Sequence, residues 1–186
     1  MFKQILVAID GSATGNRGLT AAIDLASSHG AALTIVHVVD DMQSVSFIGD
    51  MGYVPADYVD KVIDDLRARG RKVLAKAESV ARDASVDVKS MLVETRGGTI
   101  ADAILAQARK VRADTIVLGT HGRRGLRRAL MGSDAEAVLR EASIPVLLVK
   151  TAKGGKRTRP GATKSTSTLR GAGAATRQPS SSAPIA

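Results

Sequence analysis

Residues 114–138 read DTIVLGTHGRRGLRRALMGSDAEAV, and this stretch decides the fold. It begins with a short apolar run at residues 114–119, of the kind that forms a strand buried on both faces of a sheet. A loop rich in Gly and Arg follows, and a short helix is predicted over residues 133–142. A buried strand, a glycine-bearing loop and a helix, in that order, form one repeating unit of a parallel α/β sheet.

The same alternation runs through residues 1–150. Further strands are predicted at residues 4–9, 32–39, 86–94 and 145–149, and further helices at residues 16–29, 57–83 and 99–111. Gly30 is expected to end the first helix, whereas Gly70 costs the second about 1 kcal/mol relative to Ala and permits a kink. The pattern predicts one doubly wound α/β domain with a parallel sheet and helices on both faces.

The chain of 186 residues has a formal net charge of +9, and most of the excess lies at its end. Residues 151–186 contain seven of the 27 Lys and Arg residues and none of the 18 Asp and Glu residues. This segment also lacks aromatic residues, so it cannot bury enough apolar surface to offset the entropy lost on ordering. We therefore predict a domain over residues 1–150 and a disordered basic tail over residues 151–186.

Composition excludes several classes of protein. The absence of Cys rules out a disulfide framework, a thiolate zinc site and a cysteine nucleophile. No apolar run reaches the ~18 residues that span a bilayer, and the N-terminus, MFKQILVAIDGS, lacks a signal-peptide cleavage site. A cytoplasmic location is therefore expected. Aromatic residues make up 2% of the chain, which removes the stacking platforms that bind single-stranded nucleic acid.

The loop after residue 119 points to an anionic ligand. Gly119, Gly122 and Gly132-Ser133 follow the spacing Gly-x2-Gly-x9-Gly-Ser. Glycine after a strand lets the backbone approach a ligand and adopt a positive φ. Amides at the start of the next helix, with Ser133 as the expected N-cap, favour a phosphate. Arginines suited to anionic oxygens lie between them, at positions 123, 124, 127 and 128. The spacing alone leaves a flexible surface loop before an ordinary cap as the alternative.

Two other strand ends are expected to lie at the same edge of the sheet. Asp10 could accept hydrogen bonds from a ribose or reach a metal through water, and a turn or helix-cap aspartate is the alternative. At the end of the second strand, backbone groups could pair with the edge of an adenine while Val38 packs on the ring. A plain strand end is the alternative there. His37 is expected to be a packed or hydrogen-bonded core histidine rather than a base.

These three segments together resemble the universal stress protein family. The matching residues are VAIDGS at 7–12, HVVD at 37–40 and GTHGRRG…MGS at 119–133, followed by PVLLVK at 145–150. The resemblance covers residues 1–150. It implies a Rossmann-like open sheet of five strands in the order 3-2-1-4-5. It also implies that ATP, ADP or AMP binds at the carboxyl edge, with Mg²⁺ or Mn²⁺ held through the phosphates.

The resemblance further implies a role for individual residues. Val38 would hold the adenine through its backbone, and Ala8, Ile9 and Asp10 would contact the base and the ribose. The residues implied to contact the ribose and phosphates are Gly119, Gly122, Arg123, Gly132, Ser133 and Asp134. Asp134 departs from the family pattern, in which an apolar residue is frequent. A carboxylate there suits the start of a helix but repels a triphosphate, which neighbouring arginines would have to offset.

The function implied by the resemblance is that of an ATP-binding regulator or protective factor in the stress response. The last strand, Ile144–Lys150, would join two copies in a homodimer. The sequence supports no activated nucleophile, so chemistry is expected to be slow or absent. Two alternatives stay open. One is a slow ATPase or nucleotidyl-transfer enzyme on the same fold. The other is nucleic-acid binding through the basic tail, which is more simply interpreted as a non-specific cationic extension.

Overall fold

The computed structural model describes residues 2–41, 55–120 and 131–150, all of which belong to one compact unit, Met1–Lys153. The tail predicted for residues 151–186 lies outside the described residues. The strands are β1 (Gln4–Ala8), β2 (Ala32–Val39), β3 (Val88–Glu94), β4 (Thr115–Gly119) and β5 (Val146–Val149). The helices are α1 (Ala13–His29), α3 (Ala56–Asp83), α4 (Ile100–Lys110) and α5 (Ser133–Glu141). The predicted alternation is confirmed, and the bounds differ only by a few residues.

All five strands are parallel and follow the order β3-β2-β1-β4-β5, as the resemblance implied. At the carboxyl end of β1, Ala8 pairs with Val36 of β2 on one side and with Leu118 of β4 on the other. The chain moves outward from β1 to β3 and then returns to the other side of β1. The carboxyl ends of β1 and β4 therefore form the switch point, which is where ligands bind in sheets of this type.

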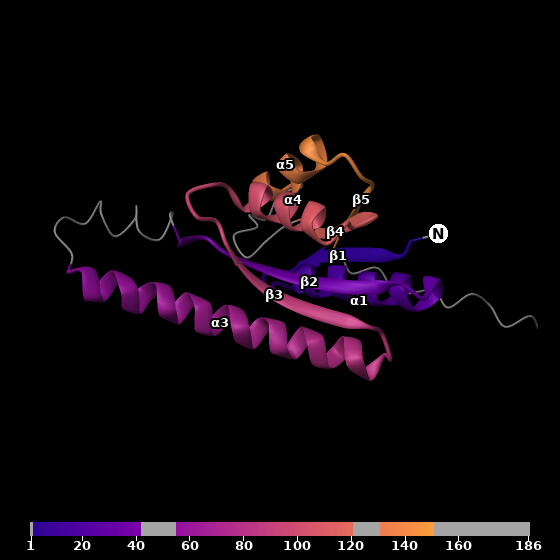
Figure 1. Cartoon of the computed structure of the whole chain (residues 1–186), viewed down its shortest axis with the longest axis horizontal. Helices are drawn as coiled ribbons and strands as arrows, with labels where there is room; N and C mark the ends of the chain where they lie inside the picture. The colour runs from indigo at the N-terminus through magenta and orange to yellow at the C-terminus, as the bar shows by residue number, and fades with distance from the viewer. Residues whose placement is uncertain (1, 42–54, 121–130, 151–186) are drawn as a thin grey trace, which may run out of the picture. The chain divides into compact units, whose positions relative to one another are not determined.

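Helices cover both faces of the sheet (Figure 1). Alternate residues of β1 enter two separate apolar clusters, which explains why its sequence is a continuous apolar run. One cluster joins Ile5 and Val7 to α1 and α3 through residues that include Leu19, Ile23, Leu74 and Ala77. The other joins Leu6 to α4 and α5 through residues that include Ile104, Leu105 and Val138. This arrangement leaves the strand ends as the places where polar chemistry can be built.

The helix ends follow local sequence with one exception. Ser12 caps α1 by accepting a hydrogen bond from Gly15 N at 3.0 Å, and Gly30 ends that helix in the left-handed region, as predicted. The predicted N-cap role of Ser133 is wrong. Gly132 is the N-cap of α5 and has an extended backbone. Its carbonyl accepts the first helical hydrogen bond, from Glu136 N at 3.0 Å.

Helix α3 runs through Gly70 as one element, and Gly70 is buried. A Cβ at this position would lie 2.5 Å from Leu92 Cδ1 and 2.7 Å from His37 Cδ2. Glycine therefore allows α3 to approach β2 and β3 closely. With 28 residues, α3 is longer than the strands that it covers, and Figure 1 shows its first turns extending past their carboxyl ends. Across the described ranges, no helix combines the length and apolarity needed to cross a membrane.

Candidate functional site

A tight turn at the end of β1 places the start of α1 at the switch point. Gly11 has a positive φ of 79°, which the turn requires. The half-buried Asp10 accepts a hydrogen bond from Ser12 N at 3.0 Å through Oδ1. The turn role left open by the sequence is thus present. It engages one carboxylate oxygen of Asp10 and fixes the direction in which this side chain leaves β1.

The end of β4 is covered by the first turn of α1. A Cβ on Gly119 would lie 2.9 Å from the carbonyl carbon of Thr14 and 3.0 Å from Gly15 N. Gly119 does not use the positive φ that is open to glycine, because the glycines with positive φ among the described residues are Gly11, Gly30 and Gly97. The missing side chain of Gly119 therefore makes room for a helix, and any contact of Gly119 with a ligand must come from its other side.

Backbone hydrogen bonds bring the start of α5 to the same edge. The buried Thr120 donates from its amide to Val149 O at 2.9 Å, and its carbonyl accepts from Gly132 N at 2.9 Å. Ser133 and Asp134 follow directly and are exposed. Gly122, Arg123 and the other three arginines of the loop lie outside the described residues. The described ends of this loop are thus closed at the switch point, with the first turn of α5 beside the end of β4.

The end of β2 contributes an apolar surface. Val38 is half-buried, and its side chain packs against the cluster on the α4 and α5 face. Ala8 of β1, Val93 of β3 and Ile100 at the start of α4 are half-buried members of the same cluster. Partly exposed aliphatic groups beside backbone polar groups suit the flat face and hydrogen-bonding edge of a heterocyclic ring.

His37 is a core residue, as predicted. It is 6% exposed, and its Nδ1 lies 2.8 Å from the carbonyl oxygen of Ile9. This hydrogen bond connects the ends of β1 and β2.

Acidic side chains near the ends of β2 and β3 have partners within the protein. Arg67 of α3 lies 2.7 Å from Glu94 and 3.0 Å from Asp64, and these two hydrogen bonds raise the pKa of the Arg67 guanidinium. The hydroxyl of Thr95 donates to Asp41. Within the described ranges, no cluster of three or more His, Asp or Glu side chains could hold a metal ion.

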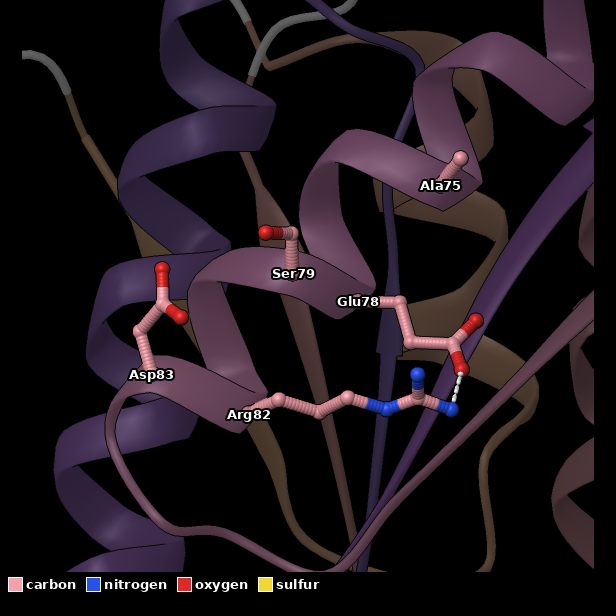
Figure 2. Close-up of a pocket in the computed structure, with 5 residues that line it drawn as sticks. All are labelled: Ala75, Glu78, Ser79, Arg82 and Asp83. Atoms are coloured by element: carbon pink, nitrogen blue, oxygen red, sulfur yellow. Dashed lines mark hydrogen bonds and ion pairs between the residues drawn. The ribbon is translucent and has the colours of Figure 1, made fainter.

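A hollow lies on the surface of the last turns of α3 (Figure 2), near the amino end of β3 and far from the candidate site. Its lining residues are Ala75, Glu78, Ser79, Arg82 and Asp83, all from one helix. Glu78 forms hydrogen bonds with Arg82 and with Ser90, near the amino end of β3. The two longest polar side chains of the hollow, Glu78 and Arg82, are thus paired with each other, and the hollow is separate from the carboxyl ends of the strands.

Residues 1–150 match the model of the Universal stress protein family. The chain belongs to this family. It is similar to the universal stress protein YxiE of Bacillus subtilis, with 32% identity over 151 residues that cover 81% of this chain and 100% of YxiE. Among solved structures, a universal stress protein family member from Burkholderia pseudomallei is 35% identical, with a TM-score of 0.61 over 78% of this chain and 94% of that one.

Two solved universal stress proteins were determined as nucleotide complexes. One, in complex with cAMP, is 25% identical with a TM-score of 0.57 and covers 81% of this chain and 98% of its own. The other, from Archaeoglobus fulgidus in complex with dAMP, is 25% identical with a TM-score of 0.55 and covers 80% of this chain and 98% of its own.

The universal stress protein fold brings most of the predicted site residues to one edge. The ends of β2, β1 and β4 and the start of α5 supply Ala8, Ile9, Asp10, Val38, Gly119, Gly132, Ser133 and Asp134. Sequence reasoning missed Thr120, which closes the loop, and the packing of Thr14 and Gly15 under Gly119. The small residues Gly15 and Gly18, three positions apart in α1, were the available signal for that packing.

Proposed function

We propose that this universal stress protein binds an adenine nucleotide, with ATP as the working ligand, across the carboxyl ends of β2, β1 and β4. The observation that carries the proposal is the closure of the loop by the Gly132–Thr120 hydrogen bond, which brings the start of α5 to the switch point. The cAMP and dAMP complexes of two neighbours support the same ligand class. The protein would act in the cytoplasm as a nucleotide-responsive regulator or protective factor in the stress response.

The phosphates would lie at the start of α5. Its N-cap is a glycine with no side-chain cap hydrogen bond, so the first amides of the helix are suited to an anion. The arginines at 123, 124, 127 and 128 add positive charge to the segment that precedes this helix. Asp134 lies in the first turn, where its negative charge interacts favourably with the helix dipole. The same charge repels a triphosphate. The arginines would offset that repulsion, as would Mg²⁺ or Mn²⁺, whose role when bound is to neutralise phosphate charge.

The base and ribose would lie on the β1–β2 side. Val38, Ala8 and their half-buried neighbours offer an apolar surface for the ring. Asp10 is held by its turn beside this surface, where its carboxylate can accept hydrogen bonds from ribose hydroxyls. Ile9 lies between them and is 4% exposed, so its contact would come through the backbone. These residues bind and orient a nucleotide and give no arrangement for rapid hydrolysis.

A second copy of the chain would pair along Ile144–Lys150. In the described sheet, β5 lies at an edge with β4 as its neighbour, and Leu147 on β5 is 41% exposed. An apolar edge strand of this kind is a site of pairing between chains. A homodimer would cover both the edge and the leucine.

Titration calorimetry with ATP tests the site. Gly132→Val puts a branched side chain where the backbone would approach the phosphates, and we expect at least a tenfold loss of affinity with an unchanged circular dichroism spectrum. Glu136→Ala is the control, because it removes an exposed side chain from the same first turn of α5 and keeps the backbone amides, and it should bind ATP nearly as the wild type does. Unchanged affinity in Gly132→Val would show that the phosphates lie elsewhere.

A further inference from the structure

The hydrogen bonds between β1 and β2 follow a regular alternation that predicts one more bond than the structure contains. At one end Ala32 N donates to Lys3 O at 2.9 Å, and at the other Ile9 N donates to Val36 O at 2.9 Å. In a parallel ladder each bonded residue donates to one neighbour and accepts from the residue two positions further along. The next bond should therefore run from Val38 N to Ile9 O.

The pairing of β2 with β3 shows that Val38 faces β1. Leu33 N donates to Asp87 O, and Val39 O accepts from Thr95 N, so odd-numbered residues of β2 bond to β3 and even-numbered ones to β1. Among the described residues, no backbone hydrogen bond joins Val38 N to Ile9 O. The ladder stops one bond short, although both residues continue the paired strands.

His37 takes the place of the missing bond. Its Nδ1 lies 2.8 Å from Ile9 O, and a carbonyl oxygen only accepts hydrogen bonds. Nδ1 must therefore carry the hydrogen and donate it. Because His37 is 6% exposed, water does not compete well for this contact. The Ile9 carbonyl is satisfied by a side chain, and the Val38 amide is left out of the ladder.

Helix α3 holds the imidazole in this position. The far edge of the His37 ring lies against Gly70 of α3. A Cβ added to Gly70 would lie 2.7 Å from Cδ2 and 3.2 Å from Nε2 of this ring. The ring is thus confined between the backbone of α3 and the Ile9 carbonyl. It has little room to rotate away and release that carbonyl to Val38.

We propose that His37 is a positioning residue that sets the base selectivity of the nucleotide site; this rests on the proposed function. The N–H and C=O of one strand residue point to the same side, here toward β1 and the site. Adenine presents an acceptor at N1 and a donor at its 6-amino group, which match that pair. Hypoxanthine and guanine present N1–H and O6, which reverse it. The hydrogen bond from Nδ1 holds Ile9 O toward the imidazole and out of the ladder with Val38, so the Val38 pair stays available for adenine.

The arrangement can be tested first without nucleotide. His37→Leu keeps an apolar side chain in the core but removes the donor, so Val38 N should then bond to Ile9 O. By NMR we expect a scalar coupling across this hydrogen bond and slower exchange of the Val38 amide in His37→Leu, and neither in the wild type. His37→Asn should behave like the wild type, because its side-chain nitrogen is attached to Cγ as Nδ1 is in histidine. A Val38–Ile9 coupling in the wild type would overturn the proposal.

Selectivity is tested by calorimetry with ATP and ITP. We expect the wild type to prefer ATP, and His37→Leu to lose roughly three- to tenfold in ATP affinity, the effect of one net hydrogen bond. Its ITP affinity should be unchanged, and His37→Asn should restore the preference. Equal losses for both nucleotides would show a merely structural role and overturn the proposal. A wild type that binds neither would overturn the proposed function, and the base-selecting role with it. The NMR result would still establish or refute the His37 contact.

Discussion

Gly119 ends β4 with the first turn of α1 lying against its Cα. In the sequence, Gly119 is a glycine at the end of a predicted strand, and a glycine in that position indicates contact with a ligand. Its packing partner Thr14 lies far away along the chain, and their contact depends on how the crossover helix settles on the sheet. Strand-end positions such as Asp10 and Val38 were therefore predictable as site candidates. The residues that pack beside these positions, as Thr14 packs beside Gly119, could not be predicted from the sequence.

Gly119→Ala should destabilise the protein by about 1–3 kcal/mol, the usual cost of overpacking. The new Cβ would lie 2.9 Å from a backbone carbon of Thr14, so α1 must shift as a whole. Gly18→Ala is the matched control on the facing helix. Its Cβ would meet Gly119 N at 3.4 Å, which is ordinary contact, and Ala favours a helix by up to about 1 kcal/mol. Urea denaturation measures both, and equal losses would contradict this account of Gly119.

The described helices begin in different ways. Ser12 caps α1 and Thr99 caps α4 through side-chain oxygens, whereas α5 begins at Gly132 with no side-chain cap. The sequence predicts Ser133 as the N-cap of α5, because serine is a preferred residue at that position. The hydrogen bond from Gly132 N to Thr120 O fixes the outcome, because it places Gly132 before the first helical turn. A boundary set by a contact with another element cannot be assigned from local preferences.

Thr99→Ala should lower the stability of the protein by about 1 kcal/mol, because it removes the cap of α4. The backbone N–H and hydroxyl of Thr99 donate to Asp102, which holds the pKa of that carboxyl below its ordinary value. The ionised Asp102 therefore stabilises the native state above the unfolded-state pKa of about 3.9, and this contribution is lost as the pH falls through the lower native pKa. The difference between wild type and variant should shrink in acid.

Urea denaturation at neutral pH and near pH 2 measures this change. Thr20→Ala is the control, because Thr20 lies inside α1, where its hydroxyl bonds to Asn16 O. It should show neither the loss nor the pH dependence. A Thr99→Ala difference that grows in acid would refute the assignment.

For the whole molecule, the alternation of strands and helices was sufficient to predict a parallel sheet covered on both faces. It was not sufficient to predict the strand order, which came from the resemblance. The order depends on which face each crossover takes. Here α1 and α3 take one face, and α4 and α5 take the other, so β4 returns beside β1. Amphipathic helices such as α4 show which of their own sides is apolar but carry no local mark of the sheet face that they will cover.

Leu147→Glu should convert the proposed dimer to a monomer, because it puts a charge on the edge strand that two copies would share. Sedimentation velocity at micromolar concentration measures the change. Tyr58→Glu is the control, since Tyr58 is 56% exposed on α3, away from β5, whereas Leu147 is 41% exposed. The control should remain dimeric. A wild type that sediments as a monomer would exclude pairing through β5.

The hydrogen bond between Thr120 and Gly132 joins the two ends of the intervening segment. The residues between these ends can therefore be replaced without changing how the segment is attached to the domain. The two anchors of the segment belong to β4 and α5, so the sheet does not depend on what joins them. Doubling the number of residues between two anchors costs only about 0.6 kcal/mol in loop-closure entropy, and replacing the arginines leaves both anchors intact. The length and charge of this segment can therefore change without altering the hydrogen bond that joins the end of β4 to the start of α5.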